Sequence, residues 1–155
     1  MIANLTLEHA LGVARNMRES DRREVMATQW EDDIERFALD CYLSKGVKWV
    51  AINKKGEPVV IGGVSINSPG VGTAWMVGTD RWLTVALEVS RFCKNSIQSI
   101  LSSGDVHRIQ AFSAKFHAES HRWLKIVGMN PGSSLSKWGK NGEDFILFEV
   151  LRYED

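Results

Sequence analysis

The stretch SHRWLKIVGM, residues 120–129, comes soon after the run HRIQAFSA, residues 107–114. Residues 107–112 have the pattern of a β-strand, and residues 117–127 have the pattern of an α-helix. Gly128 stands where such a helix would end. We therefore expect a strand that leads into a helix, which either only packs against the core or also forms one wall of a ligand site.

Upstream of this stretch, the sequence predicts three strands followed by one long helix. VKWVAI and PVVIGGVSI are β-rich runs joined by NKKGE, a hairpin signal with Gly56 in the turn. Residues 73–77 form a third β-rich run, and residues 83–101 carry a broad apolar stripe at helical spacing. Downstream, residues 144–151 predict a final strand.

The N-terminal part predicts three helices. Thr6 can cap the first, and Asp21 with Glu24 resembles a capping box that opens a short helix at residues 22–27. A third helix begins near Asp33, with Gly46 just beyond its end. The order is that of an α/β (α+β) domain, in which an antiparallel meander joins a crossover-connected strand. We expect one domain over residues 1–155, with a mixed central sheet flanked by helices.

Composition and charge exclude several classes of protein. Nineteen cationic and nineteen anionic residues balance, so no overall field attracts nucleic acid. The arginines at positions 15, 18, 22 and 23 are interspersed with acids, which predicts a solvated, ion-paired helix. No apolar run is long enough for a membrane span or a signal peptide, so we expect a cytoplasmic protein with Cys41 and Cys93 as buried thiols.

The run RWLTVA, residues 81–86, resembles the coenzyme A pyrophosphate motif of the GNAT acyltransferases. That motif has Gln or Arg first, glycine fourth, and glycine or alanine sixth. Arg81 and Ala86 keep the ends, whereas Thr84 replaces the glycine. The hydroxyl of Thr84 could donate to a phosphate, although capping of the following helix is the favoured interpretation.

SHRWLKIVGM resembles a second GNAT segment through Ser120, Trp123 and the Gly-Met ending. His117 stands where many family members have asparagine, and Leu124 stands where they have a tyrosine acid. Leucine cannot protonate a leaving thiolate, so that route to acid catalysis is absent. The resemblance covers nearly the whole chain.

The resemblance implies a GNAT fold and an N-acyltransferase that uses acetyl-CoA as donor and an amine as acceptor. The cofactor would lie between the splayed strands near Val77 and Ala111, with pantetheine along Met76 and Val77. The pyrophosphate would lie over residues 79–86, which places Thr79, Arg81, Trp82, Thr84, Ala86 and, on the opposing helix, Ser120 in the binding site.

Two residues are candidates for the base that accepts the amine proton. Asp80 follows the third strand, where a GNAT active site opens, but it is also typical of a turn. His117 could serve as the base because histidine side chains titrate near neutrality, but a solvated helix face is the favoured interpretation. His117 and His121 lack further ligands in the sequence pattern, so no metal site is expected.

A narrower resemblance is to small GNAT-like proteins of tailed bacteriophages, including an internal virion protein of podoviruses. It is carried by NMRESDRREV, AWMVGTDRW and SHRWLKIVGM. It implies either a phage-encoded acyltransferase or an inactive virion or assembly protein that binds other virion proteins through Trp82 and Trp138, in predicted loops. A small regulatory module is a third hypothesis, which no motif supports.

Overall fold

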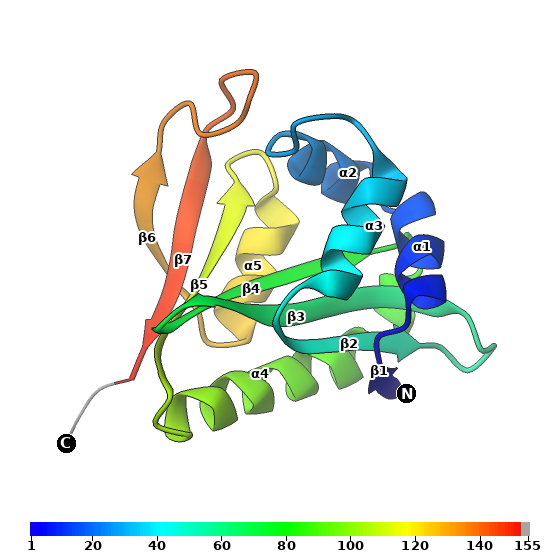
Figure 1. The fold of residues 1–155 in the computed structure, drawn as a ribbon, viewed down its shortest axis with the longest axis horizontal. Helices are drawn as coiled ribbons and strands as arrows, with labels where there is room; N and C mark the ends of the chain where they lie inside the picture. Colours follow the sequence, from blue (N-terminus) through cyan, green and yellow to red (C-terminus); the bar gives the residue numbers. More distant parts are fainter. Residues whose placement is uncertain (153–155) are drawn as a thin grey trace.

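The computed structural model describes residues 1–152 and contains one seven-stranded sheet in the order β1-β2-β3-β4-β5-β7-β6 (Figure 1). Neighbouring strands pair antiparallel except β4 and β5, which run parallel. In chain order, the elements are β1 (Ile2–Asn4), α1 (Leu7–Arg15), α2 (Glu19–Met26), α3 (Ile34–Leu43), β2 (Gly46–Ile52), β3 (Pro58–Ser68), β4 (Gly70–Gly78), the 3₁₀ turn η1 (Trp82–Thr84), α4 (Ala86–Ser102), β5 (Val106–Ala114), α5 (Ala118–Ile126), β6 (Asn130–Leu135) and β7 (Phe145–Leu151).

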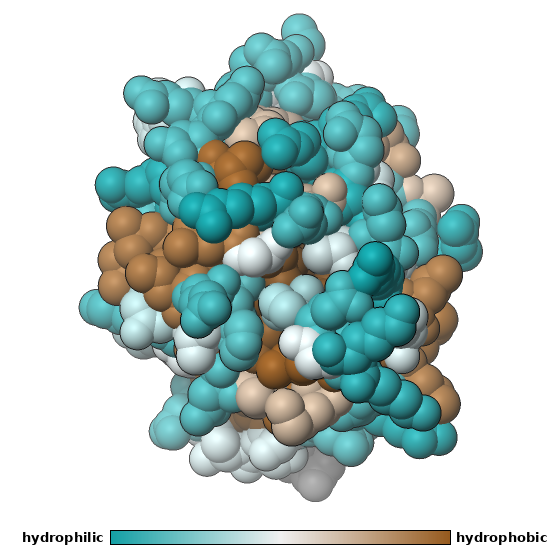
Figure 2. Space-filling view, turned by 90° about the vertical axis from the view of Figure 1, so that its right-hand side faces the viewer, coloured by the Kyte–Doolittle hydropathy of each residue, from teal (hydrophilic) through white to brown (hydrophobic). Residues whose placement is uncertain are grey.

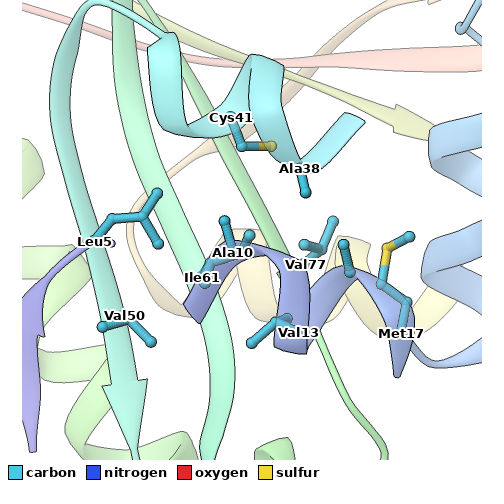
Figure 3. Close-up of a cluster of buried hydrophobic side chains, with 10 residues drawn as sticks. Leu5, Ala10, Val13, Met17, Ala38, Cys41, Val50, Ile61 and Val77 are labelled. Carbon is cyan, nitrogen blue, oxygen red and sulfur yellow. The ribbon is translucent and has the colours of Figure 1, made fainter. Parts of the chain in front are cut away.

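Helices cover both faces of the sheet. Ala10 and Val13 of α1 pack against Val50 and Ile61 of the sheet, and Cys41 of α3 completes this layer (Figure 3). On the opposite face, α4 and α5 lie against the sheet (Figure 1). Because both faces are covered, the central strands read as almost continuous apolar runs instead of alternating ones.

Two adjacent glycines in β3 make room for tryptophan rings on opposite faces of the sheet. A Cβ atom added to Gly62 would lie 2.5 Å from the ring of Trp49, and one added to Gly63 would lie 3.0 Å from the ring of Trp75. Successive residues of a strand point to opposite faces, so the two rings lie on opposite faces of the sheet, each against one glycine. This close approach explains why the Gly-Gly pair stands within an otherwise β-branched strand.

The predicted cap at Thr6 and the predicted start of a helix near Asp33 are both confirmed. The hydroxyl of Thr6 accepts from the N–H of His9 at 3.1 Å, and the carboxylate of Asp33 accepts from the N–H of Arg36 at 3.0 Å. The predicted capping box is wrong, because α2 begins at Glu19 and Asp21 lies inside the helix. The predicted position of Gly46 directly after the third helix is also wrong, since Gly46 is the first residue of β2 and has a φ of +117°.

Strands at both edges of the sheet were not predicted. β6 contains Pro131 and Gly132 and is mostly exposed, so its sequence carries breakers and no apolar face.

Figure 2 shows another side of the molecule, where hydrophilic side chains predominate and hydrophobic ones form separate patches. Within residues 1–152, no helix is long and apolar enough to cross a membrane.

Candidate functional site

β4 and β5 are neighbours for only part of their length. Their parallel pairing runs from Gly70 with Val106 to Thr73 with Gln110, and no pairing joins the strands beyond Thr73. From there β5 continues to pair with β7, while β4 continues to pair with β3. The two strands therefore diverge into a wedge, and the backbone of β4 after Thr73 has no strand partner on the β5 side.

A cavity of about 490 Å³ occupies the wedge. Trp75, Met76 and Val77 of β4 line one side, and Ala111 and Phe112 of β5 line the other. Further lining residues come from α3, α4 and α5, so the cavity reaches both faces of the sheet. A cavity of this size can hold a small ligand or an extended arm of a larger one.

Helix α2 closes the wide end of the wedge with two carboxyl side chains. Asp21 Oδ2 accepts from the N–H of Gly78 at 2.8 Å, at the end of β4. Glu24 Oε2 accepts from the N–H of Ala114 at 3.0 Å, at the end of β5. Residues three apart share one face of a helix, so a single turn of α2 holds both diverging strands.

Asp21 is the centre of a buried charge cluster. Its side chain is 5% exposed and accepts from Arg18 Nη2 at 2.8 Å. His117 Nε2 lies 2.7 Å from Asp21 Oδ1 and must donate, because a carboxylate only accepts. Burial opposes ionisation of Asp21, but His117, Arg18 and the N–H of Gly78 together lower its pKa. Asp21 is therefore a fixed anion.

Glu24 has the opposite electrostatic character. Burial raises its pKa to about 7, against the opposing effects of His117, the N–H of Ala114 and Ser113. The hydroxyl of Ser113 donates to Glu24 Oε2 at 3.3 Å and lies 3.1 Å from the hydroxyl of Ser120, which lines the cavity. Glu24 can therefore gain or lose a proton near neutral pH beside a ligand cavity.

Aromatic side chains form much of the cavity wall on the β5 side. The rings of Phe112 and Trp138 stack with centroids 5.4 Å apart and planes 4° apart, and Trp138 is half exposed. Trp75 presents a different feature, because its buried Nε1–H has no hydrogen-bond partner among the described residues.

Arg18 also has a buried donor that makes no hydrogen bond within residues 1–152. Its Nη1 lies 3.2 Å from Glu119 Oε2, which permits charge attraction without hydrogen-bond geometry. The guanidinium carbon lies 5.2 Å from the centroid of the Trp82 ring. Proteins seldom leave buried donors unpaired, so Arg18 Nη1 and Trp75 Nε1 are available to a ligand in the cavity that both residues line.

In the segment between β4 and α4, backbone groups form hydrogen bonds with one another. The N–H groups of Thr84 and Val85 donate to the carbonyls of Arg81 and Trp82, each at 3.0 Å. The hydroxyl of Thr84 donates to the Arg81 carbonyl at 2.7 Å. The predicted cap is wrong, because the N-cap of α4 is Val85 and no side chain caps the helix.

The structure separates the residues predicted to form the site into two groups. Met76, Val77, Trp82, His117 and Ser120 line the wedge cavity, whereas Thr79, Asp80, Arg81, Thr84 and Ala86 do not. Asp80 is exposed in the turn after β4. His117 is 3% exposed, so the interpretation as a solvated helix face is wrong. Trp82 is buried although the sequence suggested a loop.

Sequence reasoning missed Arg18, Asp21 and Glu24, which it assigned to a solvated helix or a cap. The side chain of Arg18 is only 11% exposed, which contradicts the solvated interpretation at that position. The available signal was the spacing of Asp21 and Glu24, which places both carboxyl groups on one face of α2. The partners of Asp21 and Glu24 lie far along the chain, in β4, in β5 and immediately before α5.

Coenzyme A fits this site at one end only. The wedge offers an enclosed channel and unpaired β4 backbone to an extended arm that carries amides, such as pantetheine. In the loop that follows β4, backbone N–H groups donate to carbonyls of the same loop, and Glu88 places a carboxylate in the first turn of α4. The residues present therefore fit an acyl-pantetheine thioester and do not fit the diphosphate.

Several solved structures with the same overall fold are acetyltransferases. A GNAT-family acetyltransferase from Bacillus anthracis matches with a TM-score of 0.74 and 15% identity, covering 99% of this chain and 95% of that one. The ribosomal-protein-S18-alanine N-acetyltransferase from Escherichia coli matches with a TM-score of 0.71 and 12% identity, covering 100% and 95%. Spermidine N-acetyltransferase from Vibrio cholerae matches with a TM-score of 0.71 and 8% identity, covering 98% and 93%.

These matches confirm the fold. The chain has the GNAT fold, an α+β architecture with a mixed sheet. No protein-family model and no curated protein sequence matches it. Identities this low show the fold alone, and the same fold can carry different functions. The narrower resemblance to phage proteins stays a prediction.

Proposed function

We propose that the protein transfers an acyl group from a pantetheine thioester, such as acetyl-CoA, to an amine in the wedge between β4 and β5. The observation that carries the proposal is Glu24, a half-buried carboxyl group with a pKa of about 7 at the end of the wedge cavity that α2 closes. A base is most effective when its pKa lies near the working pH. The GNAT fold supports the same reaction class.

The donor supplies an activated carbonyl, and the chain's residues position it and move protons. Backbone groups of β4 beyond Thr73 are free to bond the amides of the pantetheine arm. Trp75 Nε1–H and Arg18 Nη1–H are two donors for carbonyl oxygens in the cavity. Positioning of this kind can supply much of the rate enhancement of a transfer between two bound molecules.

Glu24 takes a proton from the ammonium form of the acceptor and so frees the nitrogen lone pair. The carbon–nitrogen bond then forms as the carbon–sulfur bond breaks, and a proton from nitrogen reaches the departing sulfur. Ser120 lines the cavity and joins Glu24 through Ser113, which gives this proton a route of hydroxyl groups. Glu24 then releases the proton that it took to water, and with this step atoms and charge balance without any other reactant.

The amine attacks the thioester directly, without an acylated cysteine. Cys41 and Cys93 both line the cavity, but burial raises the pKa of each thiol to about 12. A nucleophilic cysteine needs its thiolate form near neutral pH. Asp21 and His117 act through structure in this scheme, because they fix α2 against β4 and thereby place Glu24.

The test is an acylation assay with acetyl-CoA and a panel of primary amines, in which free thiol is followed. We expect Glu24→Gln to lower kcat by about 100-fold or more, since base catalysis contributes on that order. Glu19→Gln is the matched control, because Glu19 is exposed on the same helix. Equal rates for wild type and Glu24→Gln would remove Glu24 from the mechanism, and no turnover of any amine by the wild type would contradict the proposed activity.

The second candidate function is that of a phage virion or assembly protein that has kept this scaffold. One observation favours it: Trp30, between α2 and α3, is fully exposed, as expected of a side chain that docks on a partner. Trp82, which the sequence suggested for this role, is buried, and Trp138 stacks on Phe112. Co-sedimentation with purified virions, abolished by Trp30→Ala, tests this alternative, and absence from the particles would contradict it.

A further inference from the structure

We propose that the protein recognises its donor through the acyl-pantetheine arm, and that the nucleotide diphosphate of coenzyme A adds little affinity. The inference rests on the proposed function and goes beyond it by naming the part of the donor that is bound. It predicts that a thioester without any nucleotide serves as well as acetyl-CoA. Three features of the segment from η1 to the first turn of α4 support it.

The first feature is the use of backbone donors. A helix start binds phosphate through N–H groups that have no other partner. Here the N–H groups of Trp82, Thr84 and Val85 donate to carbonyls within the same loop, at 3.1, 3.0 and 3.0 Å. The N–H of Arg81 donates to the hydroxyl of Thr79 at 3.3 Å. Among the described residues, the N–H of Leu83 and those of the first turn of α4 make no such bond.

The second feature is the local charge. The guanidinium of Arg81 is paired with the carboxylate of Glu57. Glu88 already occupies the first turn of α4, where the helix dipole stabilises an anion, and it lies 3.1 Å from the amino group of Met1. A diphosphate would meet this carboxylate. Arg91, one turn further along, is the single cation lining the same depression.

The third feature is exposed apolar surface. Leu83 and Leu87 are 70% and 66% exposed and line the shallow depression over the first turn of α4, together with Thr84, Val85, Glu88 and Arg91. A diphosphate loses hydration when it binds, and leucine side chains return no hydrogen bonds. The wedge, in contrast, encloses its ligand between two strands and offers unpaired polar groups.

Calorimetric titration of the wild-type protein with acetyl-CoA and with S-acetylpantetheine tests the inference. We expect dissociation constants that agree within about threefold, and an acetyl-CoA affinity that changes little between low and high salt. Acetyl-CoA binding more than tenfold tighter would overturn the inference and leave the proposed function intact. Absence of heat for both ligands at millimolar concentration would overturn the proposed function together with the inference.

A gain-of-binding variant provides the second arm. Leu83→Lys combined with Glu88→Gln changes two exposed side chains, adds a cation and removes an anion at the start of α4. We expect acetyl-CoA to bind at least about fivefold tighter to this variant, while S-acetylpantetheine binds unchanged. An unchanged acetyl-CoA affinity would contradict the assignment of the weak diphosphate interaction to these residues.

Discussion

Two short segments meet at Gly78 and differ in almost every physical respect. On α2, Asp21 is buried and Glu24 is half-buried, and they accept hydrogen bonds from the backbone of β4 and β5 respectively. In the loop after β4, Arg81 and Thr84 are exposed and bond within the loop or to the nearby hairpin. The loop carries the recognisable motif, whereas α2 carries the shifted pKa values and the cavity wall. Burial, and not motif similarity, creates a group that titrates near neutrality.

The largest effect should come from Asp21, because it holds Arg18, His117 and a backbone N–H in a buried setting. We expect Asp21→Ala to lower the free energy of unfolding by about 3 kcal/mol or more, since it leaves Arg18 without its principal counter-ion. Urea unfolding measures the change. Glu19→Ala, on the exposed side of the same helix, should stay within about 0.5 kcal/mol. Equal losses in both variants would show that the cluster does not hold α2.

Substitution of Glu24 should raise the free energy of unfolding above neutral pH, whereas substitution of Asp21 lowers it. Its folded-state pKa of about 7 lies above the ordinary value of 4.5, so the folded state binds its proton more tightly than the unfolded state does. Stability is therefore lost as pH rises from about 4.5 to about 7. Glu24→Gln removes this loss, and we expect the variant to be more stable than wild type at pH 8 by on the order of 1–3 kcal/mol.

The same comparison at pH 4 should show little difference between Glu24→Gln and wild type, because Glu24 is then neutral in both states. Protonation of Asp21 at low pH affects both proteins equally and cancels in the difference. Urea unfolding curves at the two pH values measure both quantities. A stability difference that is the same at pH 4 and pH 8 would contradict the raised pKa of Glu24.

The pH dependence of turnover should follow the same group. We expect kcat/KM of the wild type to fall about tenfold for each pH unit below the Glu24 pKa of about 7, because a protonated carboxyl group cannot accept the amine proton. Initial rates with a saturating thioester donor measure the profile. The slower Glu24→Gln variant should lack this limb. If the limb persists in the variant, another group is the base.

The sequence was sufficient where structure depends on neighbours in the chain. Thr6 and Asp33 cap helices through bonds that span three residues, and the residue types alone predict them. The mixed central sheet followed from the succession of periodic segments, although the edge strands β1 and β6 were not predicted. β6 was not predicted because Pro131 and Gly132 usually interrupt strands, although an edge strand tolerates them.

The candidate site was less accessible to sequence reasoning, because its contacts join distant segments. His117 and Asp21 are 96 residues apart, and no local pattern relates them. Trp82 was assigned to a loop, and the loop exists, but the ring is buried beneath Arg18. Charged residues in and beside a short helix are usually solvated, so the residue types of Arg18 and Glu24 do not indicate that their side chains are partly buried. Only the tertiary arrangement distinguishes them from Glu19.

Thr84 provides the smallest and most direct test of the contrast between the two segments. Its hydroxyl bond to the Arg81 carbonyl stabilises the η1 turn from the exposed side, so Thr84→Gly should cost only about 0.5–1.5 kcal/mol in the free energy of unfolding. The substitution also restores the glycine of the pyrophosphate motif. The further inference is that this segment does not bind the diphosphate, because its N–H groups are bonded internally and Glu88 lies beside it. In that case, the glycine alone should change the affinity for acetyl-CoA by less than about twofold. Calorimetric titration decides this, with S-acetylpantetheine as the ligand that reports on the wedge. A large gain for acetyl-CoA alone would mean that the threonine side chain, and not the charge of the segment, keeps the diphosphate out.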